Sequence, residues 1–265
     1  MAILTISREF GSGGREIGQA VAALLNYEYI DKQNILSDLK SAGHEWEKWG
    51  RDLDEHCPTI WEKYDWSFRG FSALLQSCIL DHALRGKTVI MGRGGNFLLK
   101  DIPSALRVRI VAPVEKRIER IMIRDAVDRD TSKWLVEKTD HERARFIRSI
   151  YGREWDDPNE YDIICDTGKR DKEEIITLII DNLLEKEHFD TELKTLRLRA
   201  EAARLKAALL ANPKLFIPTL DVYHEGETLV LRGVVHNAKE HKAVEEEAMR
   251  LAKGVSIKCE LHYRK

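Results

Sequence analysis

A glycine-rich stretch near the start of the chain, ISREFGSGGREIG, has the residue types and spacing of an anion site. It follows a short apolar run and precedes a helical pattern. Its glycines would therefore lie at a helix N-terminus, where unpaired N–H groups and the helix dipole attract negative charge. Glycine also lets the backbone approach a phosphate closely and adopt positive φ. The residues that we expect to hold phosphate groups are Gly11, Ser12, Gly13, Gly14, Arg15 and Glu16.

The consensus phosphate loop, G-x-x-x-x-G-K-[ST], fits this stretch only in part. In the frame from Glu9 to Glu16, Gly14 takes the second glycine and Arg15 takes the lysine, while Glu9 and Glu16 replace the first glycine and the Ser/Thr. Arg15 can bind phosphate bidentately, and we expect it to act in catalysis in place of the lysine. A glycine turn that caps a helix without a ligand accounts for the same residues, so the loop alone leaves both interpretations open.

A second glycine turn, MGRGG, follows another apolar run and carries Arg93. Ligands of open α/β sheets bind beyond the carboxyl ends of the strands. We therefore expect Arg93 to bind a ligand at this edge, and the family resemblance given below implies that this ligand is the acceptor phosphate and that Arg93 takes part in catalysis. The alternative is a surface arginine in an ion pair, which the flanking glycines make the weaker interpretation because they expose the turn.

Magnesium is expected wherever ATP phosphates are bound, often through water. Glu16 and Asp166 are the carboxylates that could contact it, but no cluster of carboxylates is spaced to form a metal site. The nine histidines show no ligand spacing either. We predict no metal site built from protein side chains alone.

Composition excludes several classes of protein. The net charge of −2 provides no global field for nucleic acid or a membrane surface. The four cysteines show no C-x-x-C spacing, which favours reduced thiols over a disulfide framework or a metal cluster. We expect no secretion signal in MAILTISREF and no membrane-spanning run, and hence a cytoplasmic protein.

Short apolar runs alternate with helical patterns over the first two thirds of the chain, which predicts a parallel sheet covered by helices on both faces. The fold class is therefore α/β within a domain of residues 1–186, and the family resemblance given below implies a P-loop NTPase-type sheet. The expected strands are Ile3–Ile6, Thr88–Met91, Leu106–Val111 and Asp162–Cys165.

The C-terminal part, residues 187–265, has a different pattern. A helix-favouring stretch rich in Leu and Ala ends at Asn212-Pro213, and it could supply the interface of a homo-oligomer. A strand, a turn at Gly226, a second strand, a helix and a third strand are expected after it. This αββαβ order predicts a small α+β domain, whose segments LVLRGVV and AKGVSIKCELHY resemble the BON domain, an interaction module of unknown partner here.

The segment from Gly43 to Arg69 is rich in aromatic residues but has little periodicity. We interpret it as a helical excursion that could close over a ligand. A surface subdomain that packs its own aromatic side chains is an equal alternative.

Five blocks of the sequence resemble, in order and spacing, the cytidylate kinase-like family. The resemblance covers about Met1 to Leu184 and implies a P-loop kinase that transfers the γ-phosphoryl group of ATP to CMP or dCMP, with ATP and Mg²⁺ bound. The blocks are LTISREFGSGGREIG, YIDKQNIL, VIMGRGGNFLL, VRIVAPVEKRIERI and TDHERARFIRSIYGREWDDPNEYDIICDTG.

The same resemblance implies further site residues. Asp31 matches an aspartate of the monophosphate site, Lys32 could reach the acceptor phosphate, and Asp140 with the catalytic Arg143 forms the Asp-x-x-Arg pattern that holds CMP. Asp128 is a second candidate for the aspartate of that pattern. The arginines that could act in a lid over the donor phosphates are Arg120, Arg124, Arg145 and Arg148.

Arg120 and Arg124 also share one helical face with Arg117, with glutamates interleaved, so a solvated helix face explains them equally well. The altered loop leaves an alternative to the kinase as a whole. This alternative is a catalytically degenerate nucleotide-binding protein that signals through its C-terminal domain.

Overall fold

The computed structural model describes residues 1–43, 46, 49, 65–187, 193–215, 217, 219–252 and 254–263. These residues divide into two compact units. The first contains Met1–Ser37 and Arg85–Glu192, and the second contains Asp38–Trp49, Pro58–Leu84 and Leu193–Lys265, as far as they are described. The second unit thus takes residues from inside the predicted kinase-like domain, and the predicted domain limits of 1–186 and 187–265 stay a prediction.

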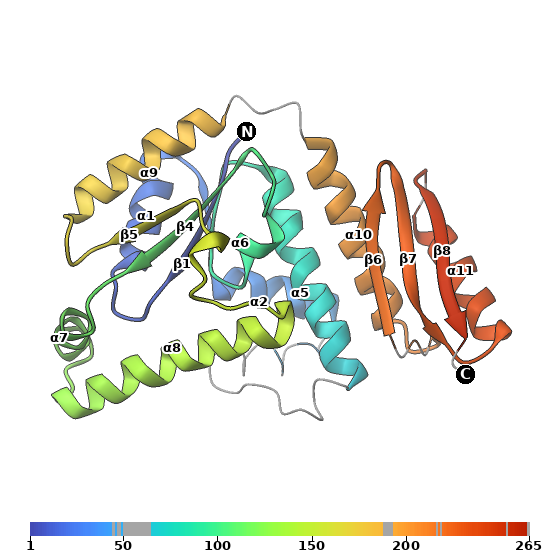
Figure 1. Ribbon diagram of the computed structural model, residues 1–265, viewed down its shortest axis with the longest axis horizontal. Coiled ribbons are helices and arrows are strands. Elements are labelled where there is room, and N and C mark those ends of the chain that lie inside the picture. Colours follow the sequence, from blue (N-terminus) through green and yellow to red (C-terminus); the bar gives the residue numbers. More distant parts are fainter. Residues whose placement is uncertain are drawn as a thin grey trace. The chain divides into compact units, whose positions relative to one another are not determined.

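The first unit is built on a five-stranded, fully parallel sheet with the order β2-β3-β1-β4-β5 (Figure 1). The strands are β1 (Ile3–Arg8), β2 (Glu28–Ile30), β3 (Thr88–Met91), β4 (Ala105–Val111) and β5 (Ile163–Asp166). The four predicted strands are confirmed. Only β2 was missed, because three residues are too short to show a period. The order places β1 at the centre, so its carboxyl end delivers the glycine loop to the middle of the sheet edge.

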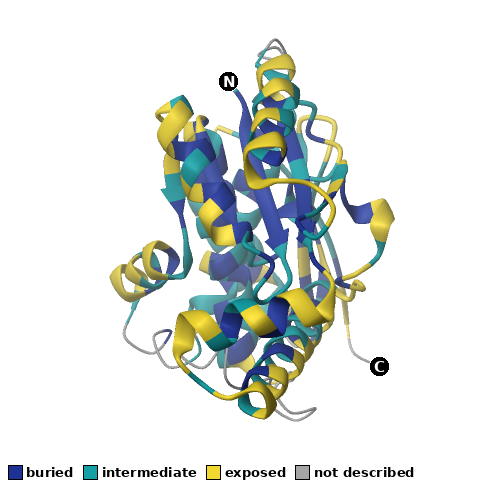
Figure 2. Ribbon diagram, turned by 90° about the vertical axis from the view of Figure 1, so that its left-hand side faces the viewer, coloured by how far each residue is buried: buried dark blue, intermediate teal, exposed yellow. Residues whose placement is uncertain are grey.

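Helices flank this sheet, as the α/β prediction requires. Helices α1 and α9 pack together, and apolar side chains from both meet alternate residues of the central strands, including Leu4, Ile6 and Val108. Figure 2 shows these strands buried between helices whose outer faces are exposed. The helices that begin in the first unit are α1 (Gly14–Leu25), α2 (Lys32–Ala42), α6 (Gly95–Leu98), α7 (Val114–Asp125), α8 (Arg129–Tyr151), the 3₁₀ turn η1 (Pro158–Glu160) and α9 (Lys172–Lys186).

The second unit contains a separate three-stranded sheet, in which β6 and β7 are antiparallel and β7 and β8 are parallel. Its elements are α5 (Trp66–Arg85, up to Leu84), α10 (Leu193–Ala211), β6 (Thr219–Glu225), β7 (Thr228–Val235), α11 (Ala238–Leu251) and β8 (Ser256–Tyr263). The predicted αββαβ order is present. Apolar residues of α10 such as Leu205 and Leu209 are used inside this unit, where they pack on the sheet.

Most of the aromatic segment from Gly43 to Arg69 lies outside the described residues, so its predicted closure over a ligand has no structural counterpart here. The described part packs on α5: Trp46 is buried against Gly70, and the ring of Trp49 lies 5.3 Å from that of Phe68. Among the described cysteines, Cys78, Cys165 and Cys259 are free thiols, while Cys57 is outside the described residues. None of the described helices has the length and apolar character to cross a bilayer.

Candidate functional site

The glycine loop connects the end of β1 at Arg8 to the start of α1 at Gly14. Two of its glycines, Gly11 (φ 78°) and Gly13 (φ 83°), are left-handed, and Gly13 is the N-cap of α1. A Cβ atom at Gly11 would lie only 3.0 Å from the carbonyl oxygen of Arg117. Glycine is thus required at Gly11 both by its positive φ and by the lack of room for a Cβ atom. These two requirements explain why glycines occur at these positions of the sequence.

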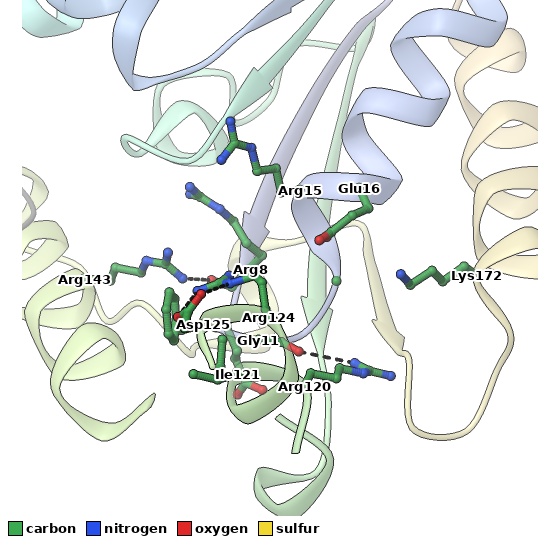
Figure 3. A pocket seen from close by; sticks show the side chains of 14 residues that line it. Arg8, Gly11, Arg15, Glu16, Arg120, Ile121, Arg124, Asp125, Arg143 and Lys172 are labelled. Atoms are coloured by element: carbon green, nitrogen blue, oxygen red, sulfur yellow. Dashed lines mark hydrogen bonds and ion pairs between the residues drawn. The ribbon is translucent and has the colours of Figure 1, made fainter. Parts of the chain in front are cut away.

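A cavity of about 620 Å³ opens over this loop. Six basic side chains line it against three acidic ones, and the first turn of α1 faces it, so it favours an anion. Figure 3 shows Arg143 approaching from α8 and Lys172 from α9, on opposite sides of the loop. The lining residues are Arg8, Glu9, Phe10, Gly11, Gly13, Gly14, Arg15, Glu16, Arg120, Ile121, Arg124, Asp125, Arg143 and Lys172.

Glu9 lines the cavity, and its carboxylate also supports the loop. Its Oε2 atom accepts a hydrogen bond from the backbone N–H of Ala112 at 3.1 Å and lies 3.4 Å from Nε of Arg117. Its Oε1 atom lies 3.8 Å from the buried guanidinium of Arg109. The side chain that replaces the first glycine of the consensus therefore fixes the loop to β4 and α7.

Asp140 and Arg143 of α8 also hold the loop. One carboxylate oxygen of Asp140 accepts the N–H of Phe10 at 2.8 Å, and the other pairs with the buried Arg117. Arg143 donates to the carbonyl oxygen of Arg8 at 2.8 Å. The two residues of the predicted Asp-x-x-Arg pattern thus lie together at the phosphate loop. Asp140 has both oxygens engaged there.

Arg120 has contacts that differ from those of a mobile lid residue. Its guanidinium donates to the carbonyl oxygens of Gly11 (3.3 Å) and Thr167 (3.1 Å) and to the hydroxyl of Thr167 (2.8 Å). That hydroxyl in turn donates to the carbonyl oxygen of Ser12 at 2.8 Å. Arg120 therefore connects the loop to the segment that follows β5.

The other predicted lid arginines are dispersed. Arg124 forms two hydrogen bonds with Asp125, at 2.7 and 2.8 Å, and lies over the ring of Phe10. This pairing raises the pKa of Arg124 and lowers the pKa of Asp125. Arg145 and Arg148 are exposed on α8 outside the cavity lining, and Arg148 pairs with Glu154 at 2.8 Å.

Arg15 lines the cavity but extends away from Arg120 in Figure 3. Its side chain is 68% exposed, and Nη2 lies 3.9 Å from Asp31. Asp31 also accepts the N–H of Gln33 at 2.8 Å at the start of α2, the helix that Lys32 opens. Neither Asp31 nor Lys32 lines the cavity over the loop.

A second, smaller cavity of about 30 Å³ lies at the MGRGG turn. The carbonyl oxygen of Arg93 accepts a hydrogen bond from the buried hydroxyl of Tyr151 at 2.6 Å, and burial raises the pKa of this tyrosine. Arg8 and Arg143 line both cavities, so the two are adjacent. The lining residues are Ser7, Arg8, Gly92, Arg93, Gly94, Asn96, Arg143, Phe146, Ile147 and Trp155.

Two basic lining residues were missed by the sequence reasoning. Arg8 could have been found, because it is the last residue of the strand that enters the loop, where ligands of α/β sheets bind. Lys172 carries no such signal. Its Cε atom would lie 3.3 Å from a Cβ at Gly13, a contact between segments far apart in the chain.

The described residues include no cluster of three or more metal-ligating side chains. A single carboxylate in the cavity is suitable for Mg²⁺, which commonly uses one or two carboxylates together with substrate phosphates. This carboxylate is Glu16, because Glu9 is engaged with arginines and Asp125 is paired with Arg124. Asp166, the other predicted candidate, accepts the N–H of Gly168 at 2.8 Å outside the cavity lining.

Comparison with known proteins identifies relatives of the first unit. The model of the cytidylate kinase-like family matches residues 3–169. The chain is 28% identical over 187 residues to a cytidylate kinase of Methanocaldococcus jannaschii, an alignment that covers 68% of this chain and 98% of that protein. A cytidylate kinase of Pyrobaculum islandicum is 23% identical over 182 residues, which are 68% of this chain and 92% of that protein.

A solved structure of the same fold is the crystal structure of an uncharacterized protein from Eubacterium ventriosum. It superposes with a TM-score of 0.55 at 24% sequence identity and covers 69% of this chain and 98% of that chain. At this identity the likeness is one of fold. The family match ends before the C-terminal sheet, and its resemblance to the BON domain stays a prediction.

Proposed function

Because the chain belongs to the cytidylate kinase-like family, we propose that it is an ATP-dependent nucleoside monophosphate kinase that transfers the γ-phosphoryl group of ATP to CMP or dCMP. The observation that carries this proposal is the arrangement of two adjacent cavities that share Arg8 and Arg143. Phosphoryl transfer needs a donor and an acceptor held in line, with positive charge around the transferred group.

We assign the donor to the larger cavity. The phosphates of ATP would lie on the loop, where the first-turn N–H groups of α1 and the cavity's basic side chains can bind them. Mg²⁺, when bound with the nucleotide, would contact Glu16 and the phosphate oxygens and would neutralise part of their charge. The other two acidic residues of the cavity, Glu9 and Asp125, pair with arginines, which limits repulsion of the phosphates.

We assign the acceptor phosphate to the smaller cavity at the MGRGG turn. Arg93 and Arg143 both line it, and both were predicted to bind the acceptor from the sequence. The buried hydroxyl of Tyr151 fixes the backbone of this turn. The acceptor oxygen would then face the donor across the arginines that the two cavities share.

The test is an assay of ADP release with ATP, Mg²⁺ and each of CMP, dCMP, UMP and AMP in turn. We expect turnover with a cytidine acceptor. Arg93→Ala should raise the KM for the acceptor by about tenfold or more, the effect of losing a charged contact, with little change in the KM for ATP. Arg129→Ala is the matched control, because Arg129 is exposed and pairs with Glu115 outside both cavities.

Two results would count against the proposal. Turnover on none of the four acceptors, with ATP binding retained, would leave a nucleotide-binding protein without kinase activity. Turnover that prefers AMP or UMP would keep the kinase and overturn the cytidine assignment. We further propose that the C-terminal unit binds a partner and that α10 supplies the interface of a homo-oligomer.

A further inference from the structure

The phosphate loop lacks a basic side chain where the consensus places one. The left-handed Gly13 ends the loop as the N-cap of α1. With Gly13 as the second glycine, the frame G-x-x-x-x-G-K-[ST] runs from Arg8 to Arg15, one residue before the frame chosen from the sequence. In this frame Gly14 stands at the lysine position and Arg8 at the first glycine. A glycine and a cation have changed places between the two ends of the loop.

The structure places these two positions against each other. A Cβ atom at Gly14 would lie 2.6 Å from Cβ and 3.2 Å from Cγ of Arg8. Gly14 is the first residue of α1 and has no left-handed φ, so its backbone does not require glycine. Glycine is required mainly by the side chain of Arg8, which fills the space into which a side chain at position 14 would start, and also by Cβ of Ile110 at 3.2 Å.

The guanidinium of Arg8 reaches the second glycine turn. A Cβ at Gly92, the first residue after β3, would lie 2.3 Å from Nη1 of Arg8. The side chain therefore passes from the phosphate loop to the acceptor turn, and Arg8 lines both cavities. Figure 3 shows it leaving the end of β1 beside the start of α1. Its charge lies between the two sites assigned above.

Lys172 faces Gly13 from α9, and the remaining cations around the loop have different tasks. Arg117 and Arg120 donate to backbone carbonyl oxygens of the loop, and Arg124 is paired with Asp125. Arg143, from α8, donates to the carbonyl oxygen of Arg8 and so supports this residue. Arg15, the residue chosen from the sequence, extends toward Asp31.

We propose that Arg8 does the work of the missing phosphate-loop lysine and contacts the phosphoryl group in transfer. The inference rests on the proposed kinase function. In the step itself, an oxygen of the acceptor phosphate forms a bond to the γ-phosphorus while the bond from this phosphorus to the β–γ bridging oxygen breaks, and ADP leaves with that electron pair. Arg8 exchanges no proton. Its planar fork binds two oxygens and stabilises the charge spread over the transferred group.

The test is an exchange of the two residues. Arg8→Gly should lower kcat with CMP by about 100-fold or more, the usual cost of removing one transition-state contact. It should also weaken ATP binding, measured by calorimetry. Gly14→Lys alone should be as impaired, because Arg8 occupies the space. The double variant Arg8→Gly with Gly14→Lys should regain at least tenfold over Arg8→Gly, since the lysine then stands at its consensus position.

Thermal unfolding of each variant separates a lost contact from a lost fold, and Arg129→Ala serves again as the control. Arg15→Ala tests the competing assignment, and a loss larger than that of Arg8→Gly would overturn the inference. The inference would also be overturned if the wild type turns over and Arg8→Gly keeps kcat within threefold of it. A double variant whose kcat is no higher than that of Arg8→Gly would overturn it as well. If the wild type binds ATP without turnover, the kinase proposal fails, and the change in ATP affinity across the same variants then decides the role of Arg8.

Discussion

Asp140 joins α8 to the phosphate loop through two interactions of different kinds. It accepts the N–H of Phe10, and it neutralises Arg117, which is only 6% exposed. An unpaired buried charge is costly, whereas a neutral amide could still accept the N–H. The residue that the Asp-x-x-Arg pattern suggested for CMP therefore has a second explanation, as a support for the glycine loop.

Asp140→Asn distinguishes these explanations. If Asp140 holds the loop, the variant should lose about 1–3 kcal/mol of stability because Arg117 loses a partner, and the KM for ATP should rise. The measurements are urea-induced unfolding and steady-state kinetics with each substrate varied. A variant of unchanged stability whose KM rises for CMP alone would instead support the acceptor role.

At the scale of elements, α8 connects the two glycine turns. Asp140 and Arg143 bind the phosphate loop, and Tyr151, at the end of the same helix, binds the carbonyl oxygen of Arg93. The helix begins at the N-cap Asp128, which accepts the N–H of Thr131 at 2.9 Å and its hydroxyl at 2.7 Å. In the sequence Asp128-Arg129-Asp130-Thr131, Thr131 stands where an Asp-x-x-Arg pattern needs arginine, and the structure shows that it is the partner of the helix cap.

Asp128→Ala should therefore act on stability and not on chemistry. Loss of an N-cap costs about 1 kcal/mol, so the thermal midpoint should fall by a few degrees. Asp128→Asn, which can still cap, should restore most of the loss. Kinetics at 25 °C should stay close to wild type. A tenfold higher KM for the acceptor in Asp128→Ala would instead support a role of Asp128 in acceptor binding.

At the scale of the whole molecule, the C-terminal sheet does not form a unit with α10 and α11 alone. Within the second unit, Arg69 of α5 donates to the carbonyl oxygen of Ile217 at 2.9 Å, and Arg204 of α10 pairs with Asp81 of α5 at 2.8 Å. Burial lowers the pKa of Arg69, while the side chains of Arg204 and Asp81 are 43% and 36% exposed. The residues before β3 are therefore part of the fold that the C-terminal elements complete.

These two contacts should differ in strength. Arg69→Ala leaves the carbonyl oxygen of the buried Ile217 without this donor, and should lower the free energy of unfolding by about 1–3 kcal/mol. Arg204→Ala removes an exposed ion pair, worth about 0–1 kcal/mol. Thermal unfolding of the full chain compares them. Equal effects would mean that α5 and the C-terminal strands are joined mainly by other contacts.

The sequence by itself determined the features that depend on neighbours along the chain. Short apolar runs predicted four of the five strands of the large sheet. The glycines predicted the loop, because a left-handed turn and a crowded helix start both require glycine. The order of elements in the C-terminal unit was readable for the same reason. A three-residue strand such as β2 was not, because it is shorter than the period that would reveal it.

The tertiary structure decided which charges meet at the loop. Asp140 and Lys172 reach it from helices more than 100 residues away, and no spacing along the chain encodes such a contact. Arg8 and Gly14 are only six positions apart in the sequence. Their relation is nevertheless visible only in the structure, where the side chain of Arg8 occupies the space next to Gly14. Residue types indicated phosphate binding, and packing placed Arg8 in the lining of both cavities.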